Sequence, residues 1–187
     1  MEIPKQPRSI SASEQDHDLM RRVALGDLSA FEELVIRHQN RAWAVAWRSL
    51  GDSSEAQDVV QEAFLRVLRA APRYRPVAPF HKYLLQIVTR LCLDVRAKKR
   101  PDYVGDLPEA AQSQTPEESL QLQERMLAVR RALGRLPARH RVAIVLRHQE
   151  GLSYDEIARV LAISTKAVDS LLQRARESLK RHLKDLL

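Results

Sequence analysis

The chain has 187 residues, 44 % of them apolar and only 5 % aromatic, with five glycines and a formal net charge of +7. This length fits one medium domain or two small ones, and abundant Ala, Leu, Arg, Glu and Gln favour helices over a sheet. The single cysteine, Cys92, excludes an internal disulfide. The composition also excludes a membrane span, because no run approaches the ~20 apolar residues that a span needs. No signal peptide is evident at the N-terminus.

The basic excess predicts a polyanionic partner, either nucleic acid or an anionic membrane surface.

The basic residues are unevenly distributed along the chain. Residues 66–100 contain ten Lys and Arg against one acid, whereas residues 101–118 contain five acids and no base. Residues 119–187 are basic again, with 14 bases and seven acids. Ordinary charged helix faces rarely produce a ten-to-one ratio, so two polyanion-binding blocks separated by an acidic spacer are predicted.

The elements follow in chain order. Residues 1–13 are rich in Pro and Ser and are expected to be disordered. Helical spacing of apolar residues then predicts a helix near 16–25 and a second over 30–50, which Asp27 or Ser29 can cap. A third helix, capped by Asp52, Ser53 or Ser54, has its apolar stripe over 56–68, and a fourth covers 80–99, with prolines marking a loop over 71–79. These helices form a domain at about 14–100. Residues 101–117 are a flexible acidic linker, and further helices at 118–134 and 138–149 open a second domain over 118–187. The predicted fold class is therefore all-α, with two small helical domains.

The second domain contains a helix-turn-helix pattern. Ser153 and Glu156 have the spacing of a capping box, which predicts a helix from Tyr154 to Leu161. Residues 162–164 form the turn, although alanine occupies position 162, where glycine is usual. Ser164 or Thr165 can cap the second helix, whose apolar residues Val168, Leu171 and Leu172 point back to the first.

The polar side of that second helix predicts binding to duplex DNA rather than an ordinary helical hairpin. Ser, Thr, Lys and Gln donate to phosphates and base edges, and Asp accepts from cytosine N4. Asp169 would repel phosphate, so it contacts a base, orients a neighbouring cation or points aside. The candidate DNA-binding residues are Ser164, Thr165, Lys166, Asp169, Ser170, Gln173, Arg174 and Arg176.

Two long stretches carry a family resemblance. LPARHRVAIVLRHQEGLSYDEIARVLAISTKAVDSLLQRARESL resembles domain four of bacterial RNA polymerase sigma factors, and GDLSAFEELVIRHQNRAWAVAWRSLGDSSEAQDVVQEAFLRVLR resembles domain two. The absence of domains one and three matches the extracytoplasmic-function class. The resemblance implies a cytoplasmic subunit that binds core polymerase, recognises −35 and −10 promoter elements and assists melting. It also implies that residues 14–100 are domain two, that residues 118–187 are domain four and that the predicted DNA-binding helix contacts the −35 element.

The resemblance further implies contacts with core polymerase, through the clamp helices of the β′ subunit and the flap of the β subunit. The matching clamp-binding run lies on the third helix, where polar residues recur at helical spacing. Taken alone, that spacing favours a solvated helix face, and the resemblance reverses this interpretation. The implied polymerase-binding residues are Asp58, Gln61, Glu62, Phe64 and Leu65.

Binding of the −10 element is implied for the basic block. In the family, the loop before the last helix of domain two captures a base flipped from the non-template strand, which requires cations and a ring or pocket. The family usually has Trp at position 83 and Asn at position 90, so the Arg90 contact differs from the usual one. The implied residues are Arg73, Tyr74 and Arg75 in the loop and Lys82, Tyr83, Gln86, Arg90 and Arg96 in the helix.

Other functions are less well supported. A stand-alone helix-turn-helix regulator remains the alternative, and it would bind duplex DNA tightly without polymerase. The six histidines form no HxxxH or HExxH pattern and no Cys–His cluster, and phosphate-loop and nucleophile-elbow motifs are missing. The sequence therefore predicts no enzyme, no metal and no cofactor. The resemblance also implies an anti-sigma factor as a partner, which would clamp two domains joined by a linker.

Overall fold

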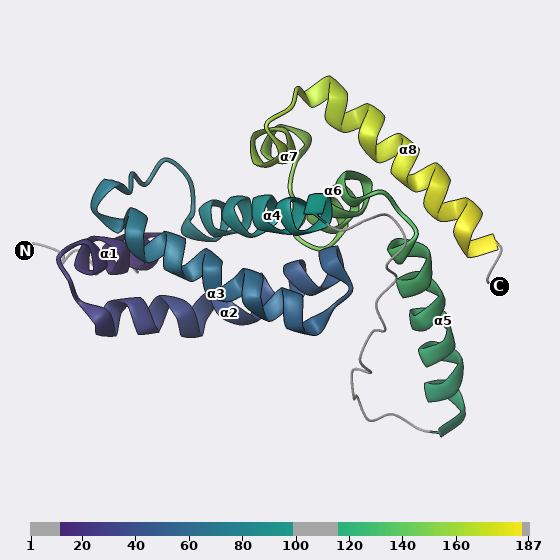
Figure 1. Ribbon diagram of the computed structural model, residues 1–187, viewed down its shortest axis with the longest axis horizontal. Helices are drawn as coiled ribbons and strands as arrows, with labels where there is room; N and C mark the ends of the chain where they lie inside the picture. Colours follow the sequence, from purple (N-terminus) through teal and green to yellow (C-terminus); the bar gives the residue numbers. More distant parts are fainter. Residues whose placement is uncertain (1–11, 99–115, 185–187) are drawn as a thin grey trace, which may run out of the picture.

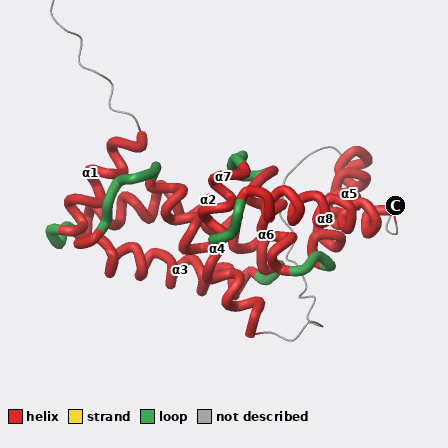
Figure 2. Tube along the Cα trace, turned by 90° about the horizontal axis from the view of Figure 1, so that it is seen from above, coloured by secondary structure: helices red, strands yellow, loops and turns green. Residues whose placement is uncertain are grey.

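The computed structural model describes residues 12–98 and 116–184, with side chains from residue 125 onward in the second range. The described residues form helices and no strand, which confirms the all-α prediction (Figures 1 and 2). The first range contains α1 (Ala12–Ala24), α2 (Leu28–Leu50), α3 (Ser53–Ala70), the short 3₁₀ turn η1 (Ala71–Arg73) and α4 (Phe80–Lys98). The second contains α5 (Pro116–Gly134), α6 (Ala138–His148), α7 (Tyr154–Leu161) and α8 (Thr165–Lys184).

The helices α1 to α4 form a first unit and α5 to α8 a second one. In the first unit, short polar residues and glycines separate the helices. The Asp27 carboxylate accepts from the backbone N–H groups at the start of α2, and Asp52 does the same for α3. Gly51 ends α2 in the left-handed region at φ +80°, where a side chain would be strained. Both caps are among those predicted from the sequence. Buried residues of all four helices then share one core, which includes Met20, Leu34, Val67, Phe80, Leu84 and Val88.

The second unit is built around the predicted helix-turn-helix. The capping box is present: the Ser153 hydroxyl accepts from the Glu156 N–H, and the Glu156 carboxylate accepts from the Ser153 N–H at 2.8 Å. The first helix of the motif spans the predicted residues, Tyr154–Leu161. Its Ile157 is fully buried against α6 and α8, in a core that includes Val142, Leu146, Val168, Leu172 and Ala175.

The two units pack directly against each other. In Figure 1, α4 lies beside α6 and α7, and α6 also contacts α2. Val145 of α6 belongs to the core of the first unit, while Leu93 of α4 packs on the core of the second. The predicted linker falls almost entirely on residues 99–115, outside the described part of the chain. Side-chain packing between the units therefore adds to the tether that the sequence predicts.

A buried arginine joins the units at the end of α2. Arg141 of α6 is 3 % exposed, and its Nε donates to the Arg48 carbonyl in the last turn of α2. Arg96 of α4 donates to the carbonyl of Leu50 in the same turn. The last carbonyls of a helix have no partner within the helix and carry its negative dipole end, so both cations are favourable there. Burial lowers the pKa of Arg141 to about 10, which still leaves it charged at neutral pH.

The turn between α7 and α8 places Ala162 in the left-handed region, at φ +52° and ψ +48°. For a residue with a Cβ this conformation costs roughly 1–2 kcal/mol, and a glycine there would lose roughly 0.5–1 kcal/mol through backbone entropy. Ala162→Gly is therefore expected to raise the free energy of unfolding of the second unit by about 0.5–1 kcal/mol. Urea unfolding followed by circular dichroism measures this change, and a less stable variant would contradict the assigned turn geometry.

Candidate nucleic-acid interface

The start of α8 presents a polar face to solvent. Ser164 caps the helix by accepting from the Ala167 N–H at 3.2 Å, whereas the Thr165 hydroxyl donates to Asp155 of α7 at 2.8 Å. Of the two caps that the sequence allowed, Ser164 is the one formed. The Thr165–Asp155 bond ties the exposed face to α7. Exposed side chains then follow at Lys166, Asp169, Ser170, Gln173 and Arg174.

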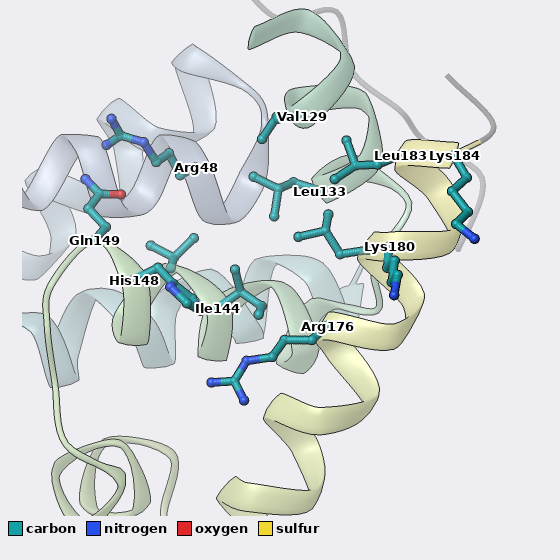
Figure 3. Close-up of a pocket in the computed structure, with 12 residues that line it drawn as sticks. Arg48, Val129, Leu133, Ile144, His148, Gln149, Arg176, Lys180, Leu183 and Lys184 are labelled. Carbon is teal, nitrogen blue, oxygen red and sulfur yellow. The ribbon is translucent and has the colours of Figure 1, made fainter. Parts of the chain in front are cut away.

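Arg176 lies apart from this set. It lines an apolar groove of about 1010 Å³ between α5, α6 and α8, whose floor includes Leu133 and Ile144 (Figure 3). Cationic side chains surround the groove: Arg176, Lys180 and Lys184 from α8, and Arg48 from α2. The groove therefore combines an apolar floor with a basic rim, and both units contribute to it.

Most of the predicted polymerase-binding residues on α3 are exposed, but Phe64 is buried. Asp58, Gln61 and Leu65 are exposed, and Leu65 is 44 % exposed although it is apolar. Glu62 accepts from Arg66 at 2.8 Å, which lowers the pKa of its carboxyl. Phe64 is only 5 % exposed and makes an edge contact with the Phe31 ring, so it belongs to the core and cannot itself contact polymerase in this fold.

The loop between η1 and α4 presents its arginines outward and its tyrosine inward. Arg73 and Arg75 are exposed. Tyr74 instead packs near the rings of Phe80 and Tyr83, with its buried hydroxyl lacking a hydrogen-bond partner among the described residues. Burial raises the pKa of Tyr74 to about 12. As placed, the Tyr74 ring anchors the loop and is not a free stacking surface for a base.

The α4 residues predicted to bind DNA do not share one free face. Lys82 forms an ion pair with Glu156 of α7, and the Gln86 amide donates to the Arg159 carbonyl at 3.4 Å. Arg90 is exposed elsewhere on the helix. Arg96 is turned to the end of α2, as described above, so in this fold it is not free to contact DNA beside Lys82. The second unit thus covers the Lys82 and Gln86 side of α4.

Sequence reasoning missed the residues that bring the two units together. Glu156 was recognised only as half of a capping box, and its carboxylate also binds Lys82, which lowers its pKa to about 2 together with the Ser153 N–H. Glu150, after α6, accepts from Arg41 of α2 at 2.5 Å. Arg130 of α5 lies 5.0 Å above the ring of Trp47. No local spacing signals such contacts, because their partners lie roughly 70 to 110 residues apart in sequence.

Comparison with known proteins gives the family. Residues 34–101 match the profile of sigma-70 region 2, and residues 126–179 match that of sigma-70 region 4. The RNA polymerase sigma-H factor of Pseudomonas aeruginosa is 34 % identical over 93 % of this chain and 96 % of its own length. The chain belongs to the extracytoplasmic-function class of the sigma-70 family. It is a sigma factor, a non-catalytic subunit that directs promoter recognition by RNA polymerase.

Further relatives agree with this assignment. The sigma factor SigW of Bacillus subtilis is 30 % identical over 89 % of this chain and 96 % of its own length. Among solved structures, CnrH in complex with the cytosolic domain of CnrY is 31 % identical, with a TM-score of 0.66 over 91 % of this chain and 98 % of that one. This similarity covers both units of the sigma factor.

No helix of the described residues is long and apolar enough to cross a membrane. Within the same residues, no group of three or more His, Cys, Asp or Glu side chains could hold a metal ion.

The Lys82–Glu156 pair yields a prediction about side-chain reactivity. In Glu156→Gln the capping box is kept, because glutamine also serves at that position, but the charge partner of Lys82 is lost. Acetylation of the Lys82 amine by an N-hydroxysuccinimide ester is expected to become about two- to fivefold faster. The effect is modest because the ion pair that protects the amine is partly exposed and therefore weak. Lys166, exposed on α8, is the internal control. An unchanged Lys82 rate would show that the ion pair does not form in solution.

Proposed function

We propose that this sigma factor binds the −35 element with the start of α8 and the −10 element with the loop 71–79 and α4, and that it assists melting there. The observation that carries the proposal is the exposed polar face of α8, held by the capped and well-packed α7. Ser164, Lys166 and Gln173 are exposed and carry donors for phosphates and base edges, although the Gln173 amide also donates to Glu177 at 3.2 Å. Asp169 is exposed beside them, as an acceptor for a base.

The −10 site as proposed requires the two units to separate. Lys82 is a candidate phosphate ligand, yet in the free chain the Glu156 carboxylate occupies it. A carboxylate and a phosphate both offer anionic oxygens, so Glu156 and DNA compete for the same amine. The Glu156 pKa lies well below its usual 4.5, so this competitor is charged at neutral pH. The stabilisation that the charged Glu156 gives to the packed units is present above about pH 4.5 and is lost as the pH falls towards 2.

Two surfaces support binding to core polymerase. The exposed acidic and polar residues of α3, with Leu65 among them, form a patch that suits the β′ clamp helices. The apolar groove of the second unit suits a helix from the flap of the β subunit, because a helix with apolar residues on one face fills such a groove. Arg48 of the first unit also lines the groove, so the binding of a helix there depends on how the two units are arranged (Figure 3).

An anti-sigma factor is the proposed regulator. A sigma factor from Bartonella quintana with the same fold, at 23 % identity and a TM-score of 0.61, was solved in complex with the anti-sigma factor NepR. In this chain, a partner that bridges α2, α6 and α8 would stabilise the packed arrangement in which Lys82 is covered. We place this activity in the cytoplasm, where core polymerase acts.

Run-off transcription with purified core polymerase tests the proposed function. A genomic fragment library serves as template, because the promoter sequence is set by details of α8 and the loop. We expect discrete transcripts that require both core and this chain, and weak binding of the chain alone to the same promoters in a gel shift. Tight duplex binding by the chain alone, without transcripts, would favour the stand-alone regulator instead.

The apolar groove yields a matched pair of variants. Val129 and Met126 are both exposed on α5, at 41 % and 46 %, but only Val129 lines the groove. Val129→Asp is expected to weaken binding to a β flap fragment about tenfold or more, because it places a charge on the apolar floor, whereas Met126→Asp leaves binding unchanged. Equal effects of the two substitutions, measured by fluorescence anisotropy, would exclude the groove as the flap site.

A further inference from the structure

Beyond η1, the loop contacts the rest of the first unit near both ends of residues 74–79. At one end the Tyr74 ring is packed 6.4 Å from the Phe80 ring and 5.2 Å from that of Tyr83. At the other end Ala78 is half-buried just before α4. The segment between them projects outward, and Val77 is 90 % exposed although it is apolar. An exposed tip of this kind keeps a defined position only if both of its ends are fixed.

One residue of α1 contacts both attachment points. The His17 Nε2–H donates to the Ala78 carbonyl at 3.2 Å, across 61 residues of sequence. The His17 ring also lies 6.1 Å from the Tyr74 ring, tilted by 51°. This histidine therefore connects the two ends of the loop, through a hydrogen bond on one side and an aromatic contact on the other.

The helix that carries His17 is itself fixed by a buried acid. Asp16 is 5 % exposed, and its carboxylate accepts from His38 Nε2 of α2 at 2.8 Å and from the Arg37 guanidinium at 3.4 Å. The His38 ring in turn lies 5.0 Å from the ring of Phe80, at the start of α4. Asp16 thus fixes the turn of α1 that carries His17, and through His38 this turn lies next to the start of α4.

We propose that His17 is a positioning residue for recognition of the −10 element: it sets the place of the loop tip, and Asp16 sets the place of His17. The inference rests on the proposed role of the loop in capturing an unpaired base. Nothing in it requires His17 to touch DNA. Helix α1, far from the loop in sequence, thereby becomes a determinant of promoter specificity.

Two substitutions separate the roles of His17. His17→Gln keeps a donor near the Ala78 carbonyl, whereas His17→Phe keeps a ring against Tyr74 and removes the donor. Thermal unfolding shows whether each variant is folded. Hydrogen exchange of the free protein then reports the order of the loop, and we expect faster exchange over residues 74–79 in His17→Phe but not in His17→Gln.

Base capture is measured on holoenzyme made with each variant. The probe is a pool of fork-junction DNAs with a randomised single-stranded segment on the non-template strand, and sequencing gives the base preference of the bound fraction. We expect the preference of the wild-type holoenzyme at the captured position to fall about three- to tenfold in His17→Phe, as for loss of one hydrogen bond. His17→Gln is expected to restore it, and the salt dependence of binding, set by phosphate contacts, to stay the same.

The outcomes distinguish this inference from the proposed function. A wild-type holoenzyme with a clear base preference that His17→Phe leaves intact overturns the role of His17 and leaves the function standing. Loss of preference in both variants, with equal loss of thermal stability, overturns it too, because it shows a merely structural role. A wild-type holoenzyme that enriches no sequence removes the proposed capture function, and the inference with it.

Discussion

The arrangement of the two units of this sigma factor depends on the hydrogen bond from the buried Arg141 guanidinium to the end of α2. It comes from the second unit, yet its hydrogen bond goes to a carbonyl of the first. Removing one partner of a buried charged hydrogen bond is costly, because the other is left without compensation. Arg96 closes the same helix end from α4, so three helices of two units meet at one set of carbonyls. At this point α6 packs on α2, while α7 contacts α4 through the Lys82–Glu156 pair and the Gln86–Arg159 hydrogen bond.

This arrangement has a functional consequence. The residues that cover the Lys82 side of α4 belong to the unit that we propose binds the −35 element, so one proposed DNA-binding unit masks part of the other. The masking contacts are polar and partly exposed, and pairs of that kind contribute little stability each. These polar contacts are therefore easily replaced, but separating the units also breaks the buried Arg141 hydrogen bond and uncovers Val145, and the binding of polymerase and promoter DNA must offset that larger cost. An anti-sigma factor that adds contacts across the same seam would shift the balance in the opposite direction.

Local features of the fold were predictable from the sequence, and long-range ones were not. Capping by Asp27, the Ser153–Glu156 capping box and the span of α7 depend on residues within a few positions of each other, where spacing is informative. Phe64 was included among the polymerase-binding residues because it lies in the run that resembles the clamp-binding segment, but its own position on α3 faces the core. Arg96 and Tyr74 carry the right chemistry for DNA, yet packing turns both inward. Residue type thus predicts what a side chain is able to bind, and tertiary packing decides whether it is free to do so.

The separation of the two units on forming the transcribing complex is the most direct test of this account. Fluorescent labels on cysteines introduced at exposed Gln57 in α3 and Arg139 in α6 report the distance between the units. Cys92 does not interfere, because it is buried and burial raises the pKa of its thiol to about 12. We expect one short distance in the free protein and a longer one in the complex with core polymerase and promoter DNA. An actively transcribing complex that keeps the distance of the free protein would contradict it.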